Sequence, residues 1–257
     1  QDNTVVAQKP TGVASKYSLQ IVKNAGVRSS SLKFIGTEAN SPLKNNGNVE
    51  TAEGGIELIH SGALDNNKGN FLSEGDIYLA FDKGVTNSTG EIQSTKTISI
   101  ETKEAKVDNI SGGNISADGN VTINSGELKN NASYIASKDK LDIQTNGKPI
   151  TNTATVGEGV GISATNGIKI NSGLFNNKEG EINSKSVIDI NTNLKVFNNI
   201  DAYIDASGDI SINSGAMYNT HSRLRSVTRV EIDTNGKALK NTGMTADTAS
   251  DDSLGIL

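Results

Sequence analysis

An asparagine recurs at nearly fixed intervals along this chain, each time two residues after an apolar residue. The series consists of Asn24, Asn45, Asn66, Asn87, Asn109, Asn130, Asn152, Asn176, Asn198, Asn219 and Asn241. Successive members are separated by 21, 21, 21, 22, 21, 22, 24, 22, 21 and 22 residues. Self-similarity at such a period indicates a stack of small structural units in which each unit contacts only its neighbours.

Two further pairs of residues recur between successive asparagines. The middle pair combines an aliphatic residue with a small one, as in Ile115 and Ala117, and the last pair combines two aliphatic residues, as in Val121 and Ile123. Alternation over so few residues is the period of a β-strand, whereas no stretch shows the spacing of an amphipathic helix. Each unit is therefore expected to hold three short strands separated by turns.

These patterns predict an all-β fold, a right-handed parallel β-helix of about eleven coils with 21–22 residues and three short strands per coil. The parallel β-helix is expected over residues 22–242, after an irregular lead-in or first coil at 1–21 and before an acidic tail or further coil at 243–257. Identical positions would stack about 4.8 Å apart, giving a rod roughly 50 Å long. A leucine-rich repeat also carries one Asn per unit, but its leucine pattern and helical stretch are missing here.

The recurrent asparagine is interpreted as a structural ladder at one corner of the coil. Asn tolerates the left-handed backbone region, and its amide both donates and accepts, so stacked copies can bond to the corner backbone and to one another. The alternative is an exposed ice-binding or sugar-binding row. The inward aliphatic residue two positions earlier favours the structural interpretation.

Composition narrows the classes of function. The chain has 257 residues, no Cys, two His and a formal net charge of -5, so thiol chemistry is excluded and metal or other cofactors are not expected. Phosphate binding needs a basic surface, so nucleic acid is not an expected partner. The apolar runs are too short for a transmembrane segment. A chain that begins at Gln1 without Met is expected to be a processed product or a piece of a longer protein.

The repeats resemble those of filamentous haemagglutinin and related exoproteins. The resemblance is carried by residues 128–137 (LKNNASYIAS), 174–184 (LFNNKEGEINS) and 196–212 (VFNNIDAYIDASGDISI), and it covers roughly residues 43–242 with a weaker unit from Val22. It implies a secreted protein at the surface of a Gram-negative bacterium, exported through an outer-membrane two-partner secretion transporter. Such proteins are adhesins or contact-dependent growth inhibition exoproteins. The Asn-Pro pairs of their secretion domain and any toxin-like segment are missing, so this sequence resembles part of the shaft.

Outward positions are the candidates for binding. The residues that follow the corner aliphatic place Phe175, Phe197 and Tyr218 in consecutive units, and we expect an external aromatic ladder that binds a host or bacterial receptor or glycan. The alternative is that these rings only shield a corner. A second candidate is the pair Arg223 and Arg225, whose guanidinium groups can hold sulfate or carboxylate, or can simply protect a strand against aggregation.

An enzyme that acts on polysaccharides is the remaining alternative, since β-helices also host lyases and hydrolases. Such sites need clustered carboxylates. Only residues 153–166 leave room for a bulge, which contains the single acid Glu158, and Asp201, Asp205 and Asp209 are expected to be ordinary surface acids. The sequence therefore predicts a non-enzymatic shaft that extends and presents adhesive or effector regions, with a receptor- or glycan-binding section as the alternative.

Overall fold

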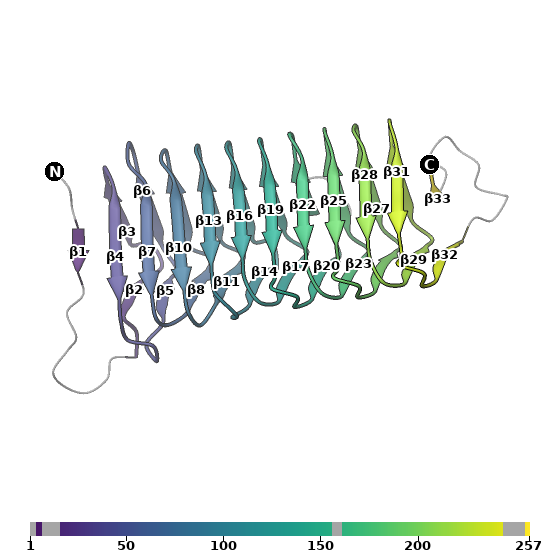
Figure 1. The fold of residues 1–257 in the computed structure, drawn as a ribbon. Helices are drawn as coiled ribbons and strands as arrows, with labels where there is room; N and C mark the ends of the chain where they lie inside the picture. The colour runs from purple at the N-terminus through teal and green to yellow at the C-terminus, as the bar shows by residue number, and fades with distance from the viewer. Residues whose placement is uncertain (1–3, 7–15, 156–160, 244–254) are drawn as a thin grey trace.

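The protein is a parallel β-solenoid, with three strands per coil and no helix among the described residues (Figure 1). The computed structural model describes residues 4–6, 16–155, 161–243 and 255–257. Three sheets of eleven strands each run the length of the rod, and every strand except the last of each sheet pairs in parallel with the strand three positions later in the chain. The predicted fold class is confirmed in this respect, while the handedness of the coil stays a prediction.

The strands are short and similar in every coil. Sheet A contains β1 (Thr4–Val6), β4 (Leu32–Gly36), β7 (Ile56–His60), β10 (Ile77–Phe81), β13 (Ile98–Glu101), β16 (Val121–Asn124), β19 (Leu141–Gln144), β22 (Ile168–Asn171), β25 (Ile188–Asn191), β28 (Ile210–Asn213) and β31 (Val230–Asp233). Sheet B contains β2 (Leu19–Ile21), β5 (Leu43–Asn45), β8 (Leu64–Asn67), β11 (Val85–Ser88), β14 (Val107–Ile110), β17 (Leu128–Asn131), β20 (Ile150–Thr153), β23 (Phe175–Lys178), β26 (Phe197–Ile200), β29 (Met217–Thr220) and β32 (Leu239–Thr242). Sheet C contains β3 (Gly26–Ser29), β6 (Asn48–Thr51), β9 (Asn70–Ser73), β12 (Glu91–Ser94), β15 (Asn114–Ala117), β18 (Tyr134–Ser137), β21 (Gly161–Ala164), β24 (Glu181–Ser184), β27 (Tyr203–Ala206), β30 (Arg223–Ser226) and β33 (Gly255–Ile256).

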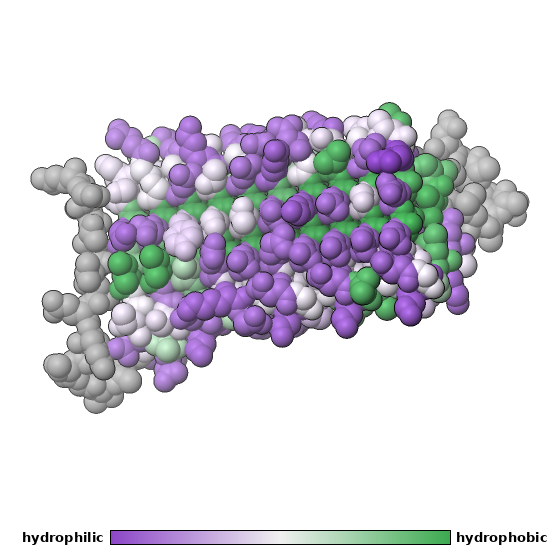
Figure 2. Space-filling model, viewed as in Figure 1, coloured by the Kyte–Doolittle hydropathy of each residue, from purple (hydrophilic) through white to green (hydrophobic). Residues whose placement is uncertain are grey.

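The core is a narrow column of stacked aliphatic and aromatic side chains. Sheet A contributes two large inward residues per strand, such as Ile98 and Ile100, and sheet C contributes one large and one small residue, such as Ile115 and Ala117. All five phenylalanines of the chain are buried. The predicted large–large and large–small slots therefore face the interior, while hydrophilic side chains form rows along the outside (Figure 2).

Strands of the solenoid also lie within the predicted lead-in or irregular first coil at 1–21 and within the predicted tail or further coil at 243–257. β2 already pairs with β5 through Leu19 and Leu43, so a coil is in progress before residue 22. At the other end, β33 pairs with β30 through Gly255 and Arg223. Most of the predicted lead-in at 1–21 and most of the predicted tail at 243–257 lie outside the described residues.

A continuous row of asparagine amides follows sheet B through the interior. Each Nδ2 atom donates to the Oδ1 atom of the asparagine in the next coil, at distances of 2.7–2.9 Å. The row consists of Asn45, Asn66, Asn87, Asn109, Asn130, Asn152, Asn177, Asn199, Asn219 and Asn241. All of its members from Asn45 to Asn219 are fully buried. Because buried amides are costly when unpaired, this continuous bonding explains why the same residue returns in each coil.

The ladder amides also satisfy the backbone at the corner between sheets B and C. Asn109 donates to the carbonyl of Tyr134 at 3.0 Å, and Asn87 donates to the carbonyl of Gly90 at 3.0 Å. A Cβ on Gly90 would lie 2.5 Å from Nδ2 of Asn66, so a small residue three positions after the asparagine leaves space for the ladder. The corner is thus built around the amide.

The left-handed backbone of this corner lies two residues after the ladder asparagine and not at the asparagine itself. Positive φ angles occur at Lys68, Thr89, Ser111, Ala132, Ala154, Glu179, Asp201 and His221. The ladder asparagines belong to strands, so tolerance of left-handed backbone is the wrong reason for their recurrence. Their hydrogen-bonding capacity is the reason the structure supports.

Three predicted members of the ladder, Asn24, Asn176 and Asn198, are wrong. In the first coil, Ile21 pairs with Asn45, and Asn24 instead adopts a left-handed corner with φ 66°. In the other two coils the ladder residues are Asn177 and Asn199, while Asn176 and Asn198 face outward and bond to each other at 2.7 Å. A shift of one residue moves every side chain of a strand to the opposite face.

The shift places Phe175 and Phe197 in the inward slot, in register with Ile150 and Met217. Both sequences read Phe-Asn-Asn, so either register supplies an asparagine to the ladder. Burying the ring removes more apolar surface from water than burying Leu174 or Val196 would, and this difference selects the register.

Hydroxyl groups pair with the backbone at the other two corners in many of the coils. After sheet C, Ser94 donates to the carbonyl of Gly75 at 2.7 Å and accepts from the amide of Lys96 at 2.8 Å. After sheet A, Thr145 donates to the carbonyl of Lys148 at 2.6 Å, and Thr192 and Thr234 repeat this turn two and four coils further on. The small slot of sheet C therefore has a hydrogen-bonding role in addition to its size.

His60 is a buried exception within the aliphatic column. Its ring stacks between Phe34 and Phe81, with centroid distances of 5.9 and 6.0 Å. Its Nδ1 atom accepts a hydrogen bond from the amide of Gly62 at 2.5 Å, and its Nε2 atom has no hydrogen-bond partner among the described residues. Burial lowers the pKa of His60, against an opposing effect of Asp82 and Glu38.

Substituting adjacent asparagines tests the ladder and its register together. Asn177→Ala removes the acceptor of the buried Asn152 amide and the donor to the buried Asn199 amide, so we expect a loss of about 2–3 kcal/mol in the free energy of unfolding. Asn176→Ala, the matched control, removes one outward hydrogen bond and should cost less than about 1 kcal/mol. Chemical denaturation measures both. A larger loss for Asn176→Ala would place that residue in the ladder and contradict the register.

His60 should make the protein less stable in acid. Since the folded-state pKa lies below that of the unfolded chain, the stability conferred by the neutral ring is present above about pH 6.5 and declines as the pH falls below it. His60→Phe keeps three stacked rings and removes the proton. We expect the melting temperature of the parent chain to fall more steeply than that of the variant between pH 7 and 5. Parallel curves would refute this role for His60.

Candidate binding surfaces

The predicted external aromatic ladder does not exist. Phe175 and Phe197 are fully buried and pack against each other with ring centroids 5.1 Å apart. Only Tyr218 faces outward, on the outer row of sheet B between Asn198 and Lys240, and the Lys240 ammonium lies 5.8 Å from its ring. Replacing the two phenylalanines would therefore damage the core and would not test a binding surface.

The predicted arginine pair lies on β30, directly beside an aspartate of the preceding coil. Arg223 donates from Nε to Oδ1 of Asp205 at 3.0 Å and from Nη2 to Oδ2, and its guanidinium lies 4.9 Å from the centre of the Tyr203 ring. Arg225 donates to the same carboxylate at 3.1 Å. The side chains of Arg223 and Asp205 are only 16% and 15% exposed, so this is a largely desolvated, two-pronged ion pair.

The pairing extends along the whole of this coil. Asp201 lies 3.5 Å from Nδ1 of His221, and Asp209 lies 3.2 Å from Nη2 of Arg229. A hydrogen bond from the Thr228 hydroxyl lowers the pKa of Asp209, with Arg229 acting in the same direction against the effect of desolvation. Three acids of one coil therefore meet four side chains of the next, His221, Arg223, Arg225 and Arg229.

This arrangement changes the interpretation of both sets of residues. Arg223 and Arg225 are already bound to Asp205, so in this structure they are not open to an anionic ligand. The three acids are surface residues with specific partners in the next coil. Asp201, Asp205 and Asp209 each pair with a residue 20 positions later, and Asp205 also pairs with Arg223, 18 positions later. The acidic segment at 201–209 precedes the basic segment at 221–229 by one coil length, and this spacing was the signal in the sequence that could have predicted the pairing.

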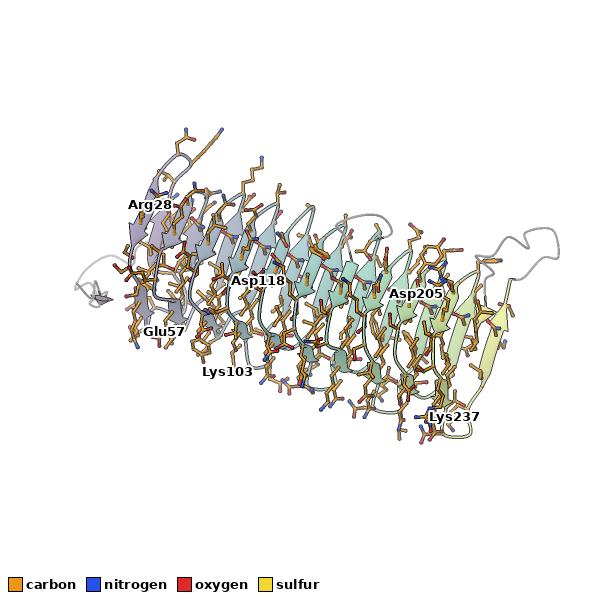
Figure 3. All side chains as sticks on the ribbon, turned by 90° about the horizontal axis from the view of Figure 1, so that it is seen from above. Arg28, Glu57, Lys103, Asp118, Asp205 and Lys237 are labelled. Carbon is orange, nitrogen blue, oxygen red and sulfur yellow. The ribbon has the colours of Figure 1, made fainter. Side chains whose placement is uncertain are left out.

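A shallow groove, not predicted from the sequence, runs along the outer face of sheet C. It consists of two adjoining depressions of about 670 and 520 Å³, which share Gln93, Asp118 and Lys138. The first reaches Glu50 on β6 and the second reaches Asn183 on β24. Figure 3 shows Asp118 about midway along the rod, between Arg28 and Asp205.

Small outward residues create the second depression. On β15, β18 and β21, the residues Ser116, Ala136 and Ser163 occupy one outward row. At the same level the outward row of sheet A holds Thr122, Asp142 and Lys169, which are longer. The groove therefore follows from side-chain size and not from any distortion of the sheet.

Neither a metal centre nor a membrane span is found in the described part of the chain. Across residues 4–6, 16–155, 161–243 and 255–257, no group of three or more histidine and acidic side chains is arranged to hold a metal ion. The same residues contain no helix that is long and apolar enough to cross a bilayer. Glu158 and the rest of residues 156–160, within the predicted bulge at 153–166, lie outside the described residues.

The fold and its surfaces define a parallel β-solenoid with a hydrogen-bonded interior, paired surface charges and a polar groove on sheet C. No protein-family model, curated protein or solved structure matches this chain. Its function is therefore inferred from its own architecture.

The ion pair between Asp205 and Arg223 can be tested by charge removal. Asp205→Asn leaves a largely buried guanidinium without its carboxylate, so we expect a loss of about 1–3 kcal/mol in the free energy of unfolding. The matched control Asp209→Asn, at a solvated position on the same coil, should have a smaller effect. Denaturation at low and high salt measures both, and equal losses would show that burial of the Asp205 pair is unimportant.

Proposed function

We propose that this chain is a structural shaft segment of a secreted bacterial surface filament, which extends adhesive or effector regions toward another cell. The observation that carries the proposal is the unbroken register of all three sheets through the described coils. Each coil repeats the same three corners and the same interior, so length can be added without a new core. Such an architecture is suited to spanning distance.

The surface of the rod supports the same role. Outward charges are paired between neighbouring coils, as in Lys33 with Glu57 at 2.7 Å and Lys138 with Asp118 at 2.7 Å. Such pairs are individually weak but penalise misregistered stacking of the coils. The resemblance of the repeats to filamentous haemagglutinin supports export through a two-partner secretion transporter.

A distance measurement tests whether the chain is a rigid spacer. Lys44 and Lys240 occupy the same outward row of sheet B, nine coils apart. Because the chain contains no cysteine, changing both residues to Cys provides two unique sites for spin labels. We expect a single narrow distance near 43 Å between these backbone sites, from nine strand spacings of about 4.8 Å. Spin-label distance measurement provides the readout.

The control for this measurement removes two coils. Deleting residues 67–109 joins Asn66 to Ile110, the residue that follows the ladder asparagine two coils later. The strands of the three sheets therefore keep their order along the chain, and the distance should fall by about 10 Å. A broad distance distribution in the full chain, or no shortening in the deletion, would contradict a rigid shaft.

Export is tested separately. The chain is placed between the secretion domain of a two-partner secretion exoprotein and an epitope, in cells that carry the matching transporter. We expect the epitope at the cell surface. Retention of the epitope inside the cell, or cleavage of polysaccharides by the purified chain, would overturn the proposal.

A further inference from the structure

We propose that the groove on sheet C binds a neutral glycan chain, with Tyr134 as its central contact. The groove follows the axis of the rod across the strands from β6 to β24. Six strand spacings give it a length of about 29 Å. A site of this shape suits an extended polymer rather than a small compact ligand.

Tyr134 is held in place before any ligand arrives. It pairs across the sheet with Gly161, which has no side chain, and its hydroxyl group is 2.9 Å from the hydroxyl of Ser163 on the same neighbouring strand. Gly161 has φ 104°, and a Cβ there would lie 2.7 Å from the carbonyl oxygen of Glu181. The ring is therefore fixed by a hydrogen bond beside a position where only glycine fits. A pre-positioned ring loses little conformational entropy on binding.

The groups around Tyr134 are neutral donors and acceptors. Ser116 and Asn183 face outward on either side of it, and Asn114 lies on the preceding strand beside the ring. The Oδ1 atom of Asn114 is buried and accepts no hydrogen bond from the described residues. Hydroxyl and amide groups both donate and accept, which matches the hydroxyl edges of a sugar, while an aromatic ring matches its apolar face.

The charges of the groove favour a neutral polymer over a charged one. Its two depressions are lined by three cationic and three anionic side chains, which sum to zero. These are Arg28, Lys138 and Lys185, and Glu50, Glu74 and Asp118. Arg28 is bound to Glu50, and Lys138 to Asp118. No net field attracts a polyanion such as a nucleic acid or a sulfated glycan.

A peptide is a poorer match for this surface. Peptides that bind sheets usually add to an exposed edge, where the main chain offers unpaired N–H and C=O groups. From β6 to β24 the strands of sheet C pair with neighbours on both sides, so the groove offers only side chains. The proposal goes beyond a shaft role and does not depend on it.

The test measures binding of neutral hexasaccharides to the full chain by calorimetry, using cellohexaose, maltohexaose, laminarihexaose and chitohexaose as probes. Heparin and polygalacturonate serve as charged comparators. We expect at least one neutral probe to bind, Tyr134→Ala to weaken its binding at least tenfold, and Tyr134→Phe to retain most of it because the ring remains.

Tyr203→Ser is the matched control. Tyr203 occupies the same outward row on β27 but lies outside the groove, and its ring is covered by Arg223. This change should leave the affinity for the hexasaccharide unaltered. Ala136→Lys, a second variant, places a long side chain in the groove from an outward position and should also block binding, whether or not Tyr134→Ala folds.

Several results would overturn the proposal. They are the absence of binding by every neutral probe, equal loss of affinity with Tyr203→Ser, full affinity in Ala136→Lys, or binding of the charged polymers alone. Self-association of the chain that Ala136→Lys abolishes, without sugar binding, would instead identify the groove as a contact between copies. Because neither the spin-label distance nor the surface exposure of the epitope depends on glycan binding, failure here would leave the shaft proposal intact.

Discussion

The hydrogen bond between one asparagine amide and the next is the interaction on which this architecture depends. A solenoid turns its backbone sharply at three corners per coil, and a corner packed against the core must pair its amides without water. The buried row from Asn45 to Asn219 does this at the corner between sheets B and C. Serine and threonine hydroxyls do it at the others, as with Ser94 and Thr145. With the corners satisfied, the aliphatic column needs only side chains of compatible size.

The inward residues therefore determine the fold, while the outward residues can vary independently of it. Most inward positions hold aliphatic, aromatic, small or amide side chains, because equivalent slots stack directly on one another. Outward positions vary from arginine to tyrosine to alanine with no change in the strands. A groove or a row of ion pairs can therefore arise from a few outward substitutions. The coil-to-coil charge pairing around Asp205 and the depression around Ala136 are two such local variations on the same scaffold.

Much of the fold was predictable from the sequence because the period of the asparagines and the alternation of apolar residues report directly on stacking. The inward slots of Ile115, Ala117, Val121 and Ile123 follow from that alternation and are buried in the structure. At the two Phe-Asn-Asn sequences, however, the register that buries the phenylalanine and the register that buries the preceding aliphatic residue fit the period equally well. There the outcome depends on whether the larger ring is buried, which is a packing energy and not a pattern.

The surfaces were less predictable for a physical reason. Whether Arg223 is open to a ligand depends on which residue lies beside it in the preceding coil, and a single unit read alone does not contain that neighbour. The groove likewise depends on Ser116, Ala136 and Ser163 being adjacent across three coils. Comparison of equivalent positions between coils, rather than along one coil, is the analysis that finds both features.

The ladder bonds also share one sense, since every Nδ2 donates toward the C-terminal coil. Backbone dipoles in a sheet largely cancel, but aligned side-chain amides add, and each bond polarises the next. The interior of the rod therefore has an electrical direction, with partial positive charge toward its C-terminal end. When two such rods meet end to end, the partial charges of their amide rows are opposite in a head-to-tail contact and alike in a head-to-head contact. The amide row therefore gives a nearly uniform stack of coils a direction.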